Sequence, residues 1–461
     1  MQITAALRER ARLAALLPQV EQAAQQKGRG GSRDRRTQRT WRPLILGALV
    51  ARSLRLLALG RAVAAQRRAH SVKAVAQGLA SCSKEAPFGA AAVSTRWLEE
   101  ALRHLDPEAV ETYRGAALVV LDPTEYEKRS RGRGKCGRQM EHIGRVRRPK
   151  TAAQRKKKGA SAPGAEPTPR VVTTYGYVDI WAGLVLRDQQ SFPLARQLFS
   201  RRHPQATSQN AVEEAVLGQA VALLGRVGWP AIVLGDRGVG RKELLIRLAQ
   251  REQGAVLRVD ADITVYPDAA PQGLLLADAL AQQPWRTEVE WDRGEQGRLR
   301  GRERTLRAAI RFSRTGRKDD VQEATLPFVE AVPLDGTTES LVLATTLAVD
   351  TPAQARALVR LYARRWAIET AVATMHARGQ DRFMVRSWVA IERLLWVLAL
   401  ADALVVLALH HPRLQRLRAQ AVAVLRQLSV VADQLTLGKL VEAIGLDFAR
   451  HSRAWLNVWG V

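Results

Sequence analysis

Cysteines and long apolar runs are scarce in this chain of 461 residues. Its two cysteines, Cys82 and Cys136, exclude a disulfide framework and a four-cysteine zinc site. Asp402 interrupts the longest apolar run, residues 394–409, which is short for a membrane span and predicts a buried helix. So few cysteines suit a reducing cytoplasm, where we expect the protein with no membrane partner. The N-terminal residues mix charged side chains into apolar positions, so we expect no signal peptide.

Acidic residues are also few, which leaves the chain strongly basic. Lys and Arg number 72 against 44 Asp and Glu, a formal net charge of +28. That charge favours a polyanionic partner, usually nucleic acid, whereas a membrane surface or an Arg-rich compositional bias are the alternatives. Residues 128–158 are rich in Lys and Arg and contain a single acid, Glu141. This segment is expected either to be a solvated loop or to follow a phosphate backbone.

The length predicts two to four domains. Residues 1–110 contain short Arg-rich helical segments, which favour a helical DNA-binding region over an ordinary helical bundle. Residues 111–262 place strands before an alternation of helix and strand, as in a mixed α/β domain. We expect a β-rich insertion over residues 263–345, a return to the α/β domain over 346–410, and a C-terminal helical region over 411–461.

Two predicted strands each end in an aspartate. Residues 115–122 end in Asp122, and residues 230–236 end in Asp236. The carboxyl ends of buried strands commonly face a functional site, although such an aspartate also occurs as a simple cap. Between them, residues 171–186 are expected to form a hairpin of two short strands.

A polar stripe runs along a helix predicted over residues 353–378. Tyr362, Arg365, Glu369 and His376 follow one another at intervals of three, four and seven, which places them on one helical face. Taken alone, the helix is most simply interpreted as having a solvated face with an Arg365–Glu369 ion pair. The two strand-end aspartates change that interpretation.

Three carboxylates at one site predict metal binding. Asp122, Asp236 and Glu369 would repel one another unless divalent cations bind between them. Their hard oxygen atoms select Mg²⁺ or Mn²⁺. Two such ions can activate a water or a 3′-hydroxyl and stabilise the leaving oxygen of a phosphodiester.

The order of these motifs resembles the DDE transposases of bacterial insertion sequences, in the subgroup with a ribonuclease-H-like core and a β-rich insertion. That subgroup has the signature Tyr-x2-Arg-x3-Glu-x6-Lys. Tyr362, Arg365 and Glu369 match it in type and spacing, whereas His376 stands at the lysine position. The resemblance extends over about residues 40–410 and includes three further blocks: Leu121 to Glu125 with Lys128, Gly235 to Gly240, and Val385 to Ser387 with Ile391 to Arg393.

The resemblance implies a ribonuclease-H-like α/β catalytic core that cleaves DNA and joins its ends. Asp122, Asp236 and Glu369 would bind two Mg²⁺ or Mn²⁺ ions. A tryptophan would stack on a flipped base, with Trp285, Trp291 and Trp366 as candidates and ordinary packing as the alternative. The implied DNA contacts are Tyr362, Arg365, His376, Lys128, Arg237 and Trp366.

The implied partners are double-stranded DNA, both the terminal inverted repeats and the target, and a second copy of the chain that bridges the two ends. The protein would act at the nucleoid of a bacterial cytoplasm. His376 is a weaker point charge than lysine near pH 7, which motivates one alternative, a related nuclease or decayed copy without strand transfer. The net charge motivates another, a non-catalytic basic DNA-binding protein.

Overall fold

The computed structural model describes residues 90–127, 140–149, 171–292, 297–335, 339–377 and 385–410. Most of the expected N-terminal helical region, Lys128, the side chain of His376 and the C-terminal region 411–461 lie outside the described residues. The predictions made for them therefore stay predictions.

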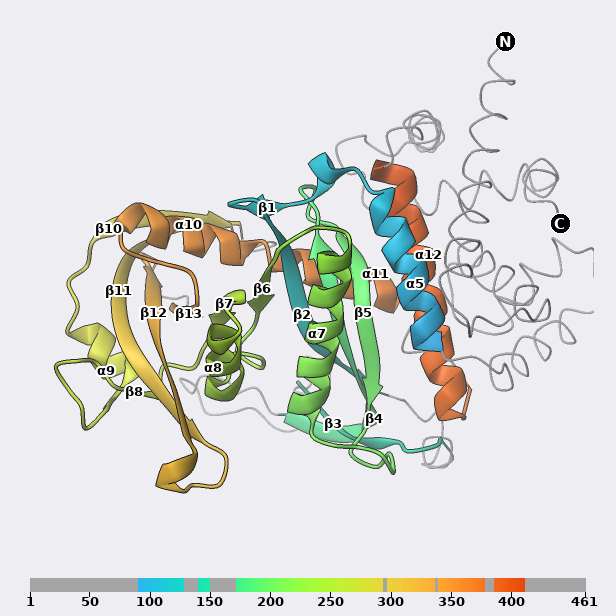
Figure 1. Cartoon of the computed structure of the whole chain (residues 1–461), viewed down its shortest axis with the longest axis horizontal. Helices are drawn as coiled ribbons and strands as arrows, with labels where there is room; N and C mark the ends of the chain where they lie inside the picture. The colour runs from blue at the N-terminus through green and yellow to red at the C-terminus, as the bar shows by residue number, and fades with distance from the viewer. Residues whose placement is uncertain are drawn as a thin grey trace, which may run out of the picture.

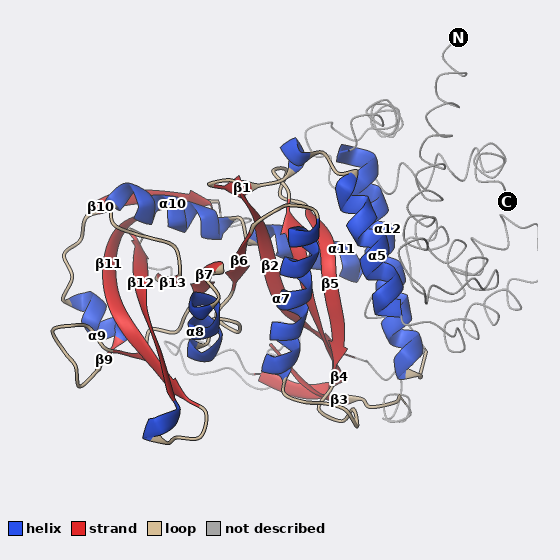
Figure 2. Ribbon diagram, in the orientation of Figure 1, coloured by secondary structure: helices blue, strands red, loops and turns tan. Residues whose placement is uncertain are grey.

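One large mixed sheet organises the described part of the chain (Figures 1 and 2). Its strands follow the order β10-β11-β12-β13-β7-β6-β2-β4-β3, with β1 paired to β2 and β5 paired to β4. Strands β2, β6 and β7 are parallel, whereas the remaining pairs are antiparallel. This mixed α/β arrangement is consistent with a ribonuclease-H-like core. The first seven strands of the sheet are β1 (Thr112–Tyr113), β2 (Ala116–Glu127), β3 (Gly144–Pro149), β4 (Val171–Val185), β5 (Ser191–Phe199), β6 (Ala231–Gly235) and β7 (Gly254–Arg258).

The parallel strands form the core because both faces of the sheet are covered there. Residues 118–121 of β2 and 233–234 of β6 have almost no exposed surface. Near-continuous apolar runs of this kind are what a doubly covered sheet requires. Helix α7 (Gln209–Arg226) packs in front of β2 and β5 in Figure 1, and α11 (Trp366–Ala377) packs behind them.

Helices α5 (Ala90–Arg103) and α12 (Trp388–His410) lie side by side against β5, and η1 (Pro107–Ala109) follows α5. The core helix expected around Asp402 is confirmed, since most of the described α12 side chains are buried. Among the described helices, none combines the length and apolarity needed to cross a membrane.

The stretch between β7 and α10 adds strands to the same sheet. It contains the small β8 (Thr264–Val265) and β9 (Leu274–Leu275) pair, α9 (Leu276–Ala281) and η4 (Lys318–Asp320). The strands β10 (Thr287–Asp292), β11 (Arg298–Ser313) and β12 (Val321–Pro333) form a twisted antiparallel ribbon. Strand β13 (Leu341–Thr345) then hydrogen-bonds to β7, so this ribbon continues the central sheet.

The hairpin expected within residues 171–186 is wrong. These residues form one strand, β4, and its hairpin partner is β5, which the pattern did not predict. Asp179, in the middle of this strand, is fully buried: Arg196 of β5 forms an ion pair with it, and the Tyr126 hydroxyl donates a hydrogen bond to it at 2.8 Å. A paired carboxylate can stay inside a strand.

The single helix expected over residues 353–378 is also wrong, because it is two helices. Helix α10 (Pro352–Ala363) begins with a capping box between Thr351 and Gln354 and ends at Arg364. Around Arg364 and Arg365 the backbone bonds span three residues instead of four, and α11 then begins. The break lets Arg365, only 7% exposed, turn toward the strand ends.

Candidate active site

Asp122 lies where the parallel pairing of β2 stops. The β2–β6 register ends at Leu121 and Gly235, but β2 itself continues to Glu127 along β4, beyond the predicted strand end. The Thr124 hydroxyl donates to Oδ2 of Asp122 at 2.6 Å. Burial raises the pKa of Asp122 above its ordinary value, and the neighbouring charges of Asp236 and Asp179 act in the same direction.

Asp236 follows β6 directly and begins a tight turn. Its backbone carbonyl accepts from the N–H groups of Val239 and Gly240, and its Oδ1 accepts from the N–H of Arg237 at 2.7 Å. The Tyr362 hydroxyl donates to the same Oδ1 at 3.1 Å. Burial acts to raise the pKa of Asp236, but Arg365 and these hydrogen bonds hold it below its ordinary value.

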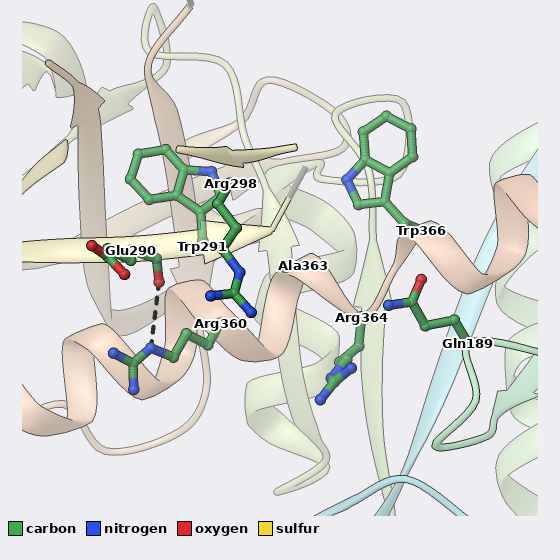
Figure 3. A pocket seen from close by; sticks show the side chains of 8 residues that line it. All are labelled: Gln189, Glu290, Trp291, Arg298, Arg360, Ala363, Arg364 and Trp366. Carbon is green, nitrogen blue, oxygen red and sulfur yellow. Dashed lines mark hydrogen bonds between the residues drawn. The ribbon is translucent and has the colours of Figure 1, made fainter. Parts of the chain in front are cut away.

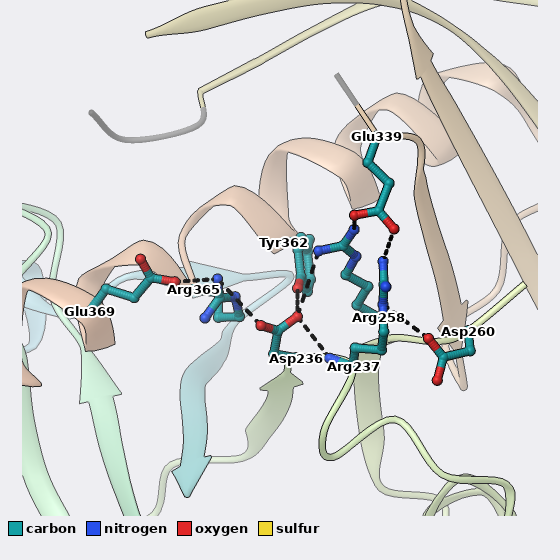
Figure 4. A network of polar contacts seen from close by, with 8 residues as sticks. All are labelled: Asp236, Arg237, Arg258, Asp260, Glu339, Tyr362, Arg365 and Glu369. Carbon is teal, nitrogen blue, oxygen red and sulfur yellow. Dashed lines mark hydrogen bonds and ion pairs between the residues drawn. The ribbon is translucent and has the colours of Figure 1, made fainter. Parts of the chain in front are cut away.

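Arg365 lies between two of the three predicted carboxylates (Figure 4). Its Nη2 is 2.5 Å from Oε1 of Glu369 and 3.9 Å from Oδ2 of Asp236. Burial raises the pKa of Glu369, and the charges of Asp236 and Asp122 raise it further, whereas Arg365 opposes the shift. The structure therefore brings all three acids into electrostatic range of one another, with one guanidinium near them.

The donor set suits hard divalent cations in its chemistry. Every candidate ligand is a carboxylate oxygen, as Mg²⁺ and Mn²⁺ prefer. Within the described ranges, however, no three acidic, histidine or cysteine side chains already stand close enough to hold an ion. Arg365 pairs with Glu369 there instead, so metal binding requires Glu369 to exchange this ion pair for the metal.

Gly240 keeps the Asp236 turn against the sheet. A Cβ at this position would lie 1.8 Å from the carbonyl oxygen of Arg258, whereas a Cβ at Gly238 would meet open space. Within the Gly-Asp-Arg-Gly-Val-Gly block, Gly240 is therefore required because the backbone of Arg258 leaves no room for a side chain.

We expect Gly240→Ala to lower the free energy of unfolding by about 1–3 kcal/mol, because the turn must shift away from β7. The same shift would displace Asp236 and reduce its contribution to the site. Urea unfolding measures the first effect, and Gly238→Ala is the matched control. Equal stability of the two variants would contradict this account of the turn.

A second arginine, which no local sequence pattern singled out, lies beside Asp236. Arg258 is the last residue of β7, and its Nη1 is 4.0 Å from Oδ1 of Asp236. Arg258 and Arg237 both pair with Glu339, and Arg237 also pairs with Asp260 (Figure 4). The strand-end rule applied to Asp236 could have found Arg258, since β6 and β7 are parallel neighbours.

A basic pocket of about 410 Å³ opens between the ribbon and the break in the helices (Figure 3). Trp366 begins α11 and lines this pocket, and the Nε of Arg360 donates to the backbone carbonyl of Glu290 at 3.3 Å. The pocket joins cations to aromatic rings, as sites for nucleic acid often do. Its lining residues are Gln189, Glu290, Trp291, Arg298, Arg360, Ala363, Arg364 and Trp366.

The three candidate tryptophans have different surroundings. Trp291 also lines the pocket but is 6% exposed, and it packs over Gly301, where a Cβ would lie 2.7 Å from its ring. Trp285 is 42% exposed, with the Arg304 guanidinium 4.3 Å from its ring centre. Trp366 combines a place in the pocket with direct continuity to Arg365, so it is the strongest candidate for a DNA contact.

The fold and the site together define a class of protein. A mixed sheet with convergent acids near its parallel strand ends, beside a basic pocket, is consistent with a nuclease-type domain of the ribonuclease-H-like kind. Residues 196–402 match the family described as the transposase DDE domain, and this match supports a transposase-type protein. The match includes Asp236 and Glu369 and begins after Asp122. No curated protein matches the chain.

Proposed function

We propose that the protein binds the terminal inverted repeats of its own insertion sequence, cleaves the DNA by metal-dependent phosphodiester hydrolysis and joins the ends to target DNA. The observation that carries this proposal is the convergence of Asp122, Asp236 and Glu369 around Arg365 in a transposase DDE domain. A simple DNA-binding protein has no need for three acids around one buried arginine.

The three carboxylates would hold two Mg²⁺ or Mn²⁺ ions. Such ions supply an activated water or 3′-hydroxyl and stabilise the leaving oxygen. The three acids differ in the direction of their pKa shifts. Asp236 has a lowered pKa and is ionised, whereas burial and mutual repulsion raise the pKa values of Asp122 and Glu369. A divalent cation bound between them would offset this repulsion and favour the ionised form of each acid.

Arg365 is the candidate phosphate contact at the centre of the site. Its Nε is buried and has no hydrogen-bond partner in the described part of the chain. A DNA phosphate offers this guanidinium a new anionic partner, which allows it to leave Glu369. The Tyr362 hydroxyl donates to Asp236, and the centre of the Tyr362 ring lies 5.8 Å from the Arg365 guanidinium carbon. Tyr362 therefore contacts both residues. Arg237, at the next position after Asp236, adds a further cation.

The test of this function uses the full chain, Mg²⁺ and duplexes that contain the element ends, which the DNA flanking the gene identifies as inverted repeats. Nicked and joined products are expected. Duplexes with pre-cleaved ends separate strand transfer from hydrolysis, because a nuclease or decayed copy would cut without joining. DNA binding with no Mg²⁺-dependent product would instead favour the non-catalytic alternative, and joining would exclude both.

Trp366 is proposed to stack on a DNA base in the basic pocket. We expect Trp366→Ala to weaken binding of an end-containing duplex by about tenfold, because stacking on an aromatic side chain contributes about 1–3 kcal/mol per base. Fluorescence anisotropy measures the affinity. Trp366→Phe keeps an aromatic face and is the matched control. Equal weakening by both variants would assign the effect to packing and not to stacking.

A further inference from the structure

Glu339 pairs with both arginines beside the catalytic aspartate. It follows β12 in the chain and lies just before β13, yet its carboxylate meets residues more than 80 positions away in sequence. Oε2 accepts a hydrogen bond from Nη2 of Arg258 at 2.9 Å, and Oε1 accepts one from Nη2 of Arg237 (Figure 4). The hydrogen bond from Arg237 is the main cause that lowers the pKa of Glu339, so the group is an anion at neutral pH.

Two guanidiniums that converge on one oxyanion make a site for a phosphate. Arg–carboxylate and Arg–phosphate pairs share the same donor geometry. Arg258 is only 17% exposed and lies next to Asp236, so an anion bound here would stand at the edge of the catalytic site. The Nε of Arg258 is buried and has no hydrogen-bond partner among the described residues.

The two arginines do not depend on Glu339 alone for their positions. Arg237 also forms an ion pair with Asp260, Nε to Oδ1 at 3.1 Å, and Arg258 also faces Asp236. Glu339 is the most exposed of these acids, with 58% of its side-chain surface accessible. An exposed acid can leave at low cost, and both arginines then keep a partner.

We propose that Glu339 is an internal substitute for a DNA backbone phosphate, and that DNA must displace it from Arg237 and Arg258 to bind productively. The contact is therefore self-inhibitory: it lowers the affinity of the free protein for DNA in general. A duplex that delivers a phosphate beside Asp236 overcomes this competition. The inference rests on the proposed DNA-processing function and adds a residue that none of the family motifs contains.

The experiment compares Glu339→Gln with the wild type in binding to an end-containing duplex without divalent metal. Removing the charge of Glu339 is expected to tighten DNA binding about three- to tenfold, because the DNA phosphate no longer competes with a charged carboxylate for Arg237 and Arg258. Glu323→Gln, in the exposed pair with Arg311 on the distal ribbon, removes the same charge elsewhere and is the control. Its effect on affinity is expected to be less than about twofold.

Arg258→Ala identifies the site of competition. On that background, Glu339→Gln is expected to lose most of its gain in affinity, because one of the two competing cations is gone. Glu339→Gln binding that is equal to Glu323→Gln, or weaker than the wild type, would overturn the proposal and would make Glu339 a positioning residue. Failure of the wild type to bind or cut DNA would instead count against the proposed function, so the two outcomes are separate.

Discussion

Asp122→Asn is expected to reduce Mg²⁺-dependent DNA cleavage by about 10³-fold or more, since a metal ligand supports several kcal/mol of transition-state stabilisation. The substitution keeps the size of the side chain and its hydrogen bond from Thr124. It removes one negative charge from the candidate site, so affinity for DNA should be retained or rise. Loss of cleavage with intact binding is therefore the expected combination.

Gel-based cleavage of an end-containing duplex measures the rate, and anisotropy measures binding on the same preparation. Asp236→Asn and Glu369→Gln should behave alike, because the proposed mechanism needs all three acids together. Asp268→Asn, at an exposed position outside the site, is the matched control. Full cleavage by Asp122→Asn would show that Asp122 binds no essential ion, and would contradict the mechanism.

Arg196→Met is expected to lower the free energy of unfolding by about 3–5 kcal/mol, because it leaves Asp179 as a buried charge without its cation. The Arg196–Asp179 pair is almost completely buried. Arg196 also donates from Nη1 to the backbone carbonyl of Leu395 at 2.5 Å, and so ties α12 to the sheet. Losing it therefore weakens both a strand pair and the attachment of a helix.

We attribute the loss of stability in Arg196→Met to the unpaired charge of Asp179, and a second substitution tests this explanation. Adding Asp179→Asn to Arg196→Met removes the unpaired charge, keeps an acceptor for the Tyr126 hydroxyl and should recover much of the stability. Urea unfolding measures each variant. Arg300→Met, in an exposed pair with Glu288, is the control and should change stability little. A double variant as unstable as the single one would contradict this explanation.

The sequence singled out Asp122, Asp236 and Glu369, which lie near one another, but it did not predict the contact between Arg258 and Glu339 beside them. Asp122 and Asp236 follow apolar strands, and Glu369 follows Arg365 at one helical turn, so local patterns carried these predictions. Arg258 and Glu339 meet only because β13 pairs with β7, a contact between segments more than 80 residues apart. No local pattern encodes such a pairing.

The errors in the predicted fold have a related cause. Strand β5 contains Pro193 and Arg196, which are unusual in a buried strand, so its sequence does not show a strand pattern. Arg196 can be buried there because it forms an ion pair with Asp179 on β4. The break between α10 and α11 contains no proline or glycine. The break coincides with the burial of Arg365 at the site, a tertiary contact that local helix propensity does not encode.

The continuity of the sheet through β13 limits how the ribbon can be studied. Strand β7 has β6 on one side and β13 on the other, and residues 255–257 are fully buried. A shortened protein that lacks β10 to β13 would leave β7 as an unprotected apolar edge, ready to pair with another molecule. Such a truncation is expected to aggregate, so point substitutions are the better way to test whether the ribbon takes part in the proposed DNA processing.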